Sequence, residues 1–156
     1  MEIRGVPLHP LVVHAAVVFV PLAALAVIAF SVPRWRWLAR WPALLLTVSA
    51  AVIVQVATLT GQDLERSRGL SSPLLVTHAR WGHRLQIAMW VLAAVMVVAF
   101  WALPHVTRLV GAADRPARVA VLEKPLSVLL PLLAGVVLVL VVVTGDAGAR
   151  ALWSGR

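Results

Sequence analysis

Four long apolar runs divide the chain. They cover residues 11–32, 42–61, 85–103 and 125–145, and none of them contains an aspartate, glutamate, lysine or arginine. Each run has roughly 20 residues, the length that an α-helix rising about 1.5 Å per residue needs to cross a hydrocarbon core about 30 Å thick. The pattern therefore predicts four membrane-spanning helices joined by short polar connections.

Proline, serine and glycine residues predict where these helices begin and end. Pro42 and Pro125 lie where a first helical turn tolerates proline, and Ser72 before a proline is typical of an N-cap. The third helix is therefore expected to begin at 73, ahead of its apolar run, and to continue to 103. Gly61 and Gly145 follow apolar runs, so they are expected to end the second and fourth helices.

The composition agrees with a protein that lies in lipid. Of the 156 residues, 62% are hydrophobic and 13% are charged, and the mean hydropathy is +0.95. In soluble domains, about 45–50% of the residues are apolar and about 25% are charged. The chain has no cysteine, which excludes disulfides and thiolate metal sites. We therefore expect an all-α integral membrane four-helix bundle.

The net charge of +8 indicates what surrounds the ends of this bundle. The basic residues lie between the apolar runs and form no single stripe, which favours lipid headgroups over nucleic acid as the partner. The first run is longer than the apolar core of a signal peptide, so we expect it to be retained.

Orientation is predicted from the basic residues outside the helices, which are commoner on the cytoplasmic side. The end with both termini carries Arg4, Arg66, Arg68, Arg150 and Arg156, and the other end carries Arg34, Arg36, Arg40, Arg108, Arg115, Arg118 and Lys124. This count places the termini on the outer face of the membrane.

The chain also repeats itself, which predicts two tandem helical hairpins, at about 6–63 and 73–148, within one domain spanning 1–156. Two histidines separated by four residues open the first and third helices, and Thr-Gly followed by aspartate closes the second and fourth. The repeated residues are His9, His14, Thr60, Gly61 and Asp63 in the first half, and His78, His83, Thr144, Gly145 and Asp146 in the second.

This repeat predicts a histidine cluster at one membrane interface. Because two spans separate the copies, both enter the membrane in the same direction, and the halves are related by an axis along the membrane normal. Five residues turn a helix through about 500°, so His9 and His14 point about 140° apart and cannot easily bind one ion together. Ligands are therefore expected to bridge two helices, for example His14 with His83.

A bridging histidine pair of this kind is typical of bound haem b, and a module that passes single electrons is the first functional hypothesis. His14 and His83 would be the axial ligands, with His9 and His78 as alternative ligands or neighbours. The other expected site residues are Arg80 and Arg84 for the propionates, and Asp63, Asp146, Thr60 and Thr144 as hydrogen-bond acceptors for the second nitrogen of each ligand.

Three other functions fit the same residues. His14 and His83 could hold copper, iron or zinc, because imidazole suits these metals. Histidine and aspartate could relay protons, as in transporters. Alternatively, the chain is a non-enzymatic subunit or assembly factor whose histidines only fix helix packing. The sequence has no nucleophile elbow and no phosphate-binding glycine loop, so no hydrolase or kinase activity is predicted.

The segment from Gly5 to His14 reads GVPLHPLVVH. It resembles the opening, of the type GLPLHPLxVH, of a family of uncharacterised four-span bacterial membrane proteins, and the likeness extends over nearly the whole chain. Some relatives are joined to a Rieske iron–sulfur domain. The resemblance therefore implies a location in the bacterial plasma membrane, a redox role with a possible bound haem, and a Rieske-type protein as partner.

Overall fold

The computed structural model describes residues 2–3, 6–69, 72–103 and 119–153. Its elements are β1 (Glu2–Ile3), β2 (Val6–Pro7), α1 (Leu8–Ser31), η1 (Pro33–Trp35), α2 (Arg36–Arg68), α3 (Pro73–Ala102), η2 (Ala120–Leu122) and α4 (Glu123–Trp153). The strands β1 and β2 pair antiparallel over two residues each. Nearly all other described residues are helical.

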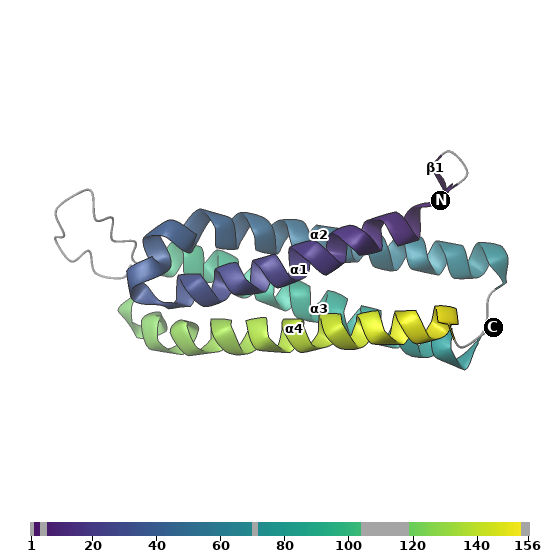
Figure 1. The fold of residues 1–156 in the computed structure, drawn as a ribbon. Coiled ribbons are helices and arrows are strands. Elements are labelled where there is room, and N and C mark those ends of the chain that lie inside the picture. The colour runs from purple at the N-terminus through teal and green to yellow at the C-terminus, as the bar shows by residue number, and fades with distance from the viewer. Residues whose placement is uncertain (1, 4–5, 70–71, 104–118, 154–156) are drawn as a thin grey trace.

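The four α-helices lie side by side in one elongated bundle (Figure 1). Helix α1 packs against α2 and α4, and α3 packs against the same two helices, so α1 and α3 are diagonally opposite. All four helices are long and apolar enough to cross a membrane. The predicted all-helical membrane bundle is therefore confirmed.

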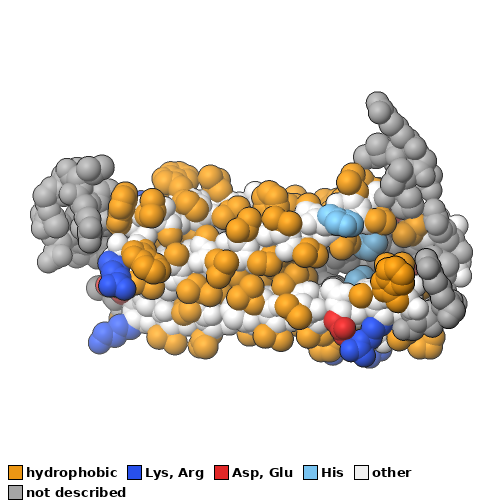
Figure 2. All heavy atoms as spheres, in the orientation of Figure 1, with side chains coloured by type: hydrophobic (Ala, Val, Ile, Leu, Met, Phe, Trp, Pro, Cys, Tyr) orange, Lys and Arg blue, Asp and Glu red, His pale blue; other side chains and the backbone are white. Residues whose placement is uncertain are grey.

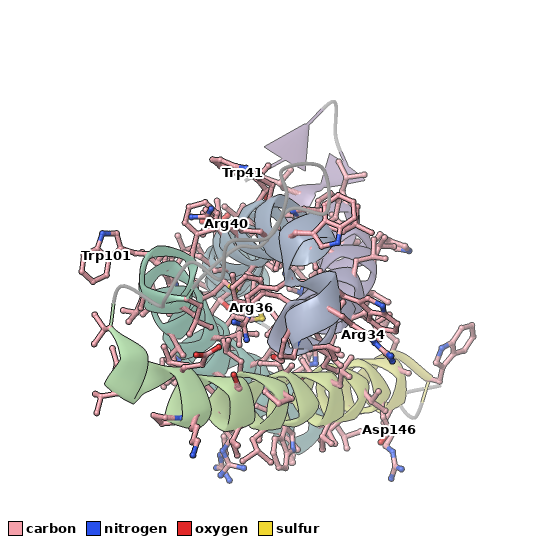
Figure 3. All side chains as sticks on the ribbon, turned by 90° about the vertical axis from the view of Figure 1, so that its left-hand side faces the viewer. Arg34, Arg36, Arg40, Trp41, Trp101 and Asp146 are labelled. Atoms are coloured by element: carbon pink, nitrogen blue, oxygen red, sulfur yellow. The ribbon has the colours of Figure 1, made fainter. Side chains whose placement is uncertain are left out.

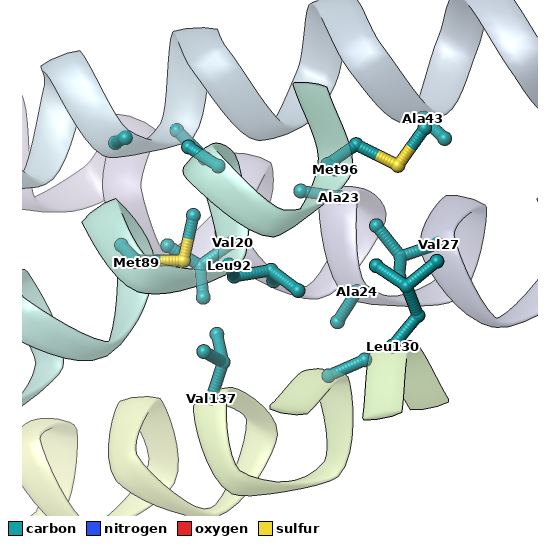
Figure 4. Packing of buried hydrophobic residues seen from close by; sticks show 14 of the residues in the cluster. Val20, Ala23, Ala24, Val27, Ala43, Met89, Leu92, Met96, Leu130 and Val137 are labelled. Atoms are coloured by element: carbon teal, nitrogen blue, oxygen red, sulfur yellow. The ribbon is translucent and has the colours of Figure 1, made fainter. Parts of the chain in front are cut away.

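Small side chains let the helices approach closely, as in other helix bundles in lipid. Ala23, Ala24 and Ala43 are fully buried, together with larger residues such as Met89 and Leu92 (Figure 4). Apolar side chains also cover the outside of the bundle, whereas the charged groups lie near its two ends (Figure 2). A soluble protein would instead expose mainly polar side chains, so this distribution matches a bilayer around the middle of the bundle.

The helix ends differ from the prediction at three positions. Gly61 and Gly145 lie inside α2 and α4, and Pro42 lies inside α2 rather than in its first turn. These helices continue past their apolar runs, because polar helix formers can extend a helix beyond the membrane. Helix α2 instead ends at Gly69, whose φ of 58° is the left-handed conformation that favours glycine. The predicted cap is confirmed, since the side chain of Ser72 accepts a hydrogen bond from the Leu75 amide.

Two arginines hold together the end of the bundle that lies opposite the termini. Arg36 is only 3% exposed, and its Nη1 lies 3.1 Å from Oε1 of Glu123, at the start of α4 (Figure 3). Its Nε also donates to the Phe30 carbonyl near the end of α1. Arg40 donates to the Phe100 carbonyl near the end of α3, at 3.0 Å. Arg4, Arg108, Arg115, Arg118 and Arg156 from the charge count lie outside the described residues.

Candidate functional site

His9 and His78 meet at the other end of the bundle. They come from the diagonal helices α1 and α3, and both are half-buried. Their ring centres are 6.3 Å apart, with the planes inclined at 73°. Figure 2 shows histidine side chains gathered at this end. The structure therefore brings together one histidine from each predicted hairpin.

Each of these two rings is anchored to the second helix of its own half. Nδ1 of His9 donates to the Ala57 carbonyl of α2 at 2.9 Å, and Nδ1 of His78 donates to the Thr144 carbonyl of α4 at 3.0 Å. A carbonyl oxygen can only accept, so Nδ1 must carry the hydrogen. In the neutral ring, Nε2 then has a free lone pair, and no described residue forms a hydrogen bond to it.

Two glycines make room for the anchored rings. A Cβ atom built on Gly61 would lie 3.0 Å from Cε1 and 3.1 Å from Nδ1 of His9, and a Cβ on Gly148 would lie equally close to His78. Such contacts are closer than a well-packed interior accepts. Gly61 lies four residues after Ala57 on α2, and Gly148 lies four residues after Thr144 on α4. Pairs of small residues at this spacing permit close packing of helices.

These contacts match the halves of the chain differently from the sequence comparison. Gly61 and Gly148 each lie against a histidine ring, and the carbonyls of Ala57 and Thr144 each accept from one. In the sequence repeat, however, Gly61 was matched with Gly145. Ala57 and Gly148 were not among the site residues predicted from the sequence. The repeated spacing of a small residue and a glycine was the signal that would have found them.

A cavity of about 180 Å³ adjoins the two rings. Its lining is mostly apolar and comes from all four α-helices. The polar residues that border it are His9, Thr58, Gln62, Glu65, His78, His83 and Thr144. The cavity thus provides a partly open and mostly apolar space beside the two imidazoles.

The structure does not bring His14 and His83 together as the sequence analysis expected. His14 is exposed, and its Nδ1 hydrogen-bonds to the Pro10 carbonyl of its own helix. His83 is also exposed, although it borders the cavity. The reason is the five-residue spacing, which turns a helix by about 140° beyond a full turn. Once His9 and His78 face inward, the later histidine on each helix points about 140° away, so that His14 does not reach the cavity and His83 lies at its border.

A family model for predicted membrane proteins (DUF2231) matches residues 5–156. The chain belongs to this family. No curated protein and no solved structure matches it. The chain is therefore a predicted membrane protein whose four apolar helices are each able to span a lipid bilayer.

The remaining predicted site residues of this DUF2231 protein lie away from the cavity. Arg80 and Arg84 are exposed and do not line it, and Arg84 stacks on Trp81 with 4.4 Å to the ring centre. Asp146 pairs with Arg150 at 2.9 Å. Asp63 does not line the cavity either. The role predicted for these carboxylates, as acceptors for the imidazoles, is filled instead by main-chain carbonyls.

The two predicted threonines act differently from each other. The hydroxyl of Thr60 donates to carbonyls of its own helix, including that of Ala57, which also accepts from His9. Thr144 contributes its main-chain carbonyl to His78, while its hydroxyl bonds to the Leu140 carbonyl. Only Thr144 therefore contacts an imidazole, and it does so through the backbone.

The described residues do not fit haem in this DUF2231 chain. Sites for drug-sized ligands have about 300–1,000 Å³, and a macrocycle lies toward the upper part of that range. The cavity of about 180 Å³ is smaller, and neither arginine expected for the propionates lines it. A single ion needs far less space. Within the part of the chain that the structure describes, however, no group of three or more His, Cys, Asp or Glu could hold a metal.

Proposed function

We propose that this membrane protein reversibly binds one transition-metal ion between His9 and His78 and passes it on at the membrane surface. Copper, iron and zinc are the candidate ions, because imidazole nitrogen suits all three. The observation that carries the proposal is the anchoring of both Nδ1 atoms to carbonyls. A metal-binding histidine commonly has this arrangement, with its other nitrogen held by a carbonyl or carboxylate.

The spacing of the rings supports the proposal. Metal–nitrogen bonds to histidine are about 2.0–2.1 Å long, and a ring nitrogen lies about 1.2 Å from its ring centre. Two imidazoles on opposite sides of one ion therefore have centres about 6.4 Å apart. The observed separation of the His9 and His78 centres is 6.3 Å, so one ion would fit between the rings if both Nε2 atoms turn toward it.

The small number of donors favours exchange over permanent storage. Structural zinc sites use four protein ligands, whereas only two imidazoles meet here. Water or a small ligand would complete the coordination, and the cavity beside the rings provides space for it. An ion held in this way leaves easily, as transport or delivery requires. Haem b and a Rieske-type partner stay predictions from the sequence.

The test is metal binding by the purified protein in detergent micelles. We expect calorimetric titration with Cu²⁺, Zn²⁺ or Fe²⁺ to give one bound ion, and His9→Ala and His78→Ala each to weaken binding about 10–100-fold. His14→Ala is the matched control, because His14 lies on the same helix but is exposed. Unchanged binding by both cavity variants would overturn the proposal. A haem absorption band lost in these variants would overturn it in favour of haem.

A structural role is the second candidate, because each histidine also ties together two helices of one half, His9 α1 to α2 and His78 α3 to α4. A double-mutant cycle with His9→Ala and His78→Ala separates the two functions. Without metal, we expect the effects on unfolding free energy to show only the modest coupling of two rings whose centres lie 6.3 Å apart. With saturating Cu²⁺ they should become strongly non-additive, because either substitution removes the shared ion. Equal coupling in both conditions would favour the structural role.

We also propose that the histidine end faces the outside of the bacterial plasma membrane, on the basis of the basic residues counted in the sequence. Because the chain has no cysteine, one introduced thiol reports the side directly. Ser67 is exposed near the end of α2. A membrane-impermeant maleimide should label Ser67→Cys in intact cells. Labelling only after permeabilisation would reverse the orientation.

A further inference from the structure

A chain of polar side chains joins α2 and α3 next to the cavity. Trp90 Nε1 donates to Oε1 of Gln55 at 3.0 Å, and Gln86 Nε2 donates to the same oxygen at 2.6 Å. Nδ1 of His83 lies 3.3 Å from Oε1 of Gln86. Polar groups among apolar helices are costly and often functional, and the proposed ion site does not use this network.

The donors and acceptors of this network follow from its tryptophan. An indole N–H can only donate, so the Gln55 atom that faces Trp90 must be its oxygen. Gln86 must then present its amide nitrogen to that oxygen, and its own oxygen is left for His83. An amide oxygen only accepts, so Nδ1 of His83 carries the hydrogen. The neutral His83 ring therefore has its lone pair on Nε2.

Three histidines that border the cavity thus have the same tautomer, with the hydrogen on Nδ1. His9, His78 and His83 all have Nδ1 committed to an oxygen acceptor and Nε2 free to bind. They do not form one three-ligand site, because no group of three potential ligands within the described residues could hold a single ion. His83 is exposed, whereas the other two are half-buried. The geometry therefore suits binding in sequence, from the exposed histidine inward.

The corresponding histidine of the first half has no such surroundings. His14 bonds to a carbonyl of its own helix and does not border the cavity. The residue three positions after His14 is Val17, where His83 has Gln86. The glutamine that holds His83 therefore has no counterpart beside His14, although the network that it belongs to reaches Gln55 on α2.

We infer that His83 is the entry ligand of the site. It binds an incoming transition-metal ion at the mouth of the cavity and passes it to the His9–His78 pair, while the Gln86–Gln55–Trp90 network fixes its ring. This inference rests on the proposed function. The transfer is a ligand exchange: one metal–nitrogen bond to His83 breaks as bonds to the inner imidazoles form, with no change of oxidation state.

An entry ligand changes the rates of binding and not the final affinity. We expect His83→Ala to slow both association and dissociation of Cu²⁺ about tenfold, with Kd changed less than twofold. Gln86→Leu, which leaves the imidazole in place but removes its anchor, should slow both rates less. His14→Ala is the matched control and should bind at the wild-type rate. Stopped-flow quenching of tryptophan fluorescence by Cu²⁺ measures association, and competition with a chelator measures dissociation.

The outcomes separate this inference from the proposed function. If Cu²⁺ binding depends on His9 and His78 but His83→Ala binds at wild-type rates, the entry role is wrong and the paired site stands. If His83→Ala weakens Kd at an unchanged association rate, His83 is a resident ligand and the entry role is also wrong. If His9→Ala and His78→Ala bind Cu²⁺ normally, the proposed function itself fails. Thermal unfolding of each variant excludes misfolding as the cause.

Discussion

Replacing Gly61 by alanine tests the packing that holds His9. The added Cβ would lie 3.0 Å from Cε1 and 3.1 Å from Nδ1 of the imidazole, so the ring or the helix must shift. Because Nδ1 donates to the Ala57 carbonyl on the same face of α2, a ring that moves away weakens this hydrogen bond as well. Gly148→Ala should act on His78 in the same way, through its bond to Thr144.

Three terms set the size of the effect. Overpacking a well-packed interior by one methyl group costs about 1–3 kcal/mol, and loss of the hydrogen bond costs about 0.5–1.5 kcal/mol. Alanine also favours a helix over glycine, which offsets up to about 1 kcal/mol. We therefore expect Gly61→Ala to destabilise the protein by about 0.5–3.5 kcal/mol and to displace His9 from its position opposite His78.

Gly145→Ala supplies the matched control, because a Cβ there meets nothing within 4 Å in the same helical setting. Both substitutions gain the same helix propensity, so the difference between them isolates the steric term. Unfolding free energies in mixed micelles, measured by circular dichroism, provide the comparison, and Cu²⁺ titration reports on the ring. If Gly61→Ala is as stable as Gly145→Ala and binds Cu²⁺ like the wild type, the close His–Gly packing is wrong.

The other predictions concern stability away from the histidine pair. Arg36→Ala should lower the free energy of unfolding by about 1.5–3 kcal/mol, because charged hydrogen bonds are lost. The control is Arg34→Ala at an exposed position, which should change the free energy of unfolding by less than about 0.5 kcal/mol. Gln55→Leu should cost about 0.6–1.7 kcal/mol and shift the Trp90 emission, whereas no shift would contradict the Trp90–Gln55 bond. Ser72→Ala should cost about 1 kcal/mol through the lost N-cap, visible as fraying of α3 by hydrogen exchange.

The helices could be predicted from the sequence, whereas most of their ends could not. An apolar run of bilayer length has few alternatives to a membrane helix, and the N-cap at Ser72 is a local signal. Glycine is ambiguous, because it can end a helix or allow another group to approach its side. Gly61 does the second in a helix that continues to Arg68. Only the position of His9, from a distant segment, decides between these roles.

The sequence predicted histidines at one end of the bundle, but it did not indicate which of them face inward, because a helix in lipid lacks the polar outer face that marks direction in water. In water, polar residues mark the outer face of a helix, whereas here both faces are apolar. Spacing by seven residues, about two turns, was the better guide. From His9 it leads to the buried residues Ala16, Ala23 and Phe30, and from His78 to the buried residues Leu85, Leu92 and Ala99. The same spacing from His83 leads to exposed Trp90.

The two halves of the bundle share an anchor but differ in their polar surroundings, and this difference gives the site a direction. Both inner histidines bond to a carbonyl four residues before a glycine. Only the second half adds Gln86, which reaches across to Gln55 on α2, two residues before the carbonyl that holds His9. The residue two positions before Thr144 is Val142, which is exposed. A symmetric pair alone would offer equal access from either side, whereas the entry role proposed for His83 would bring the ion in from the side of α3.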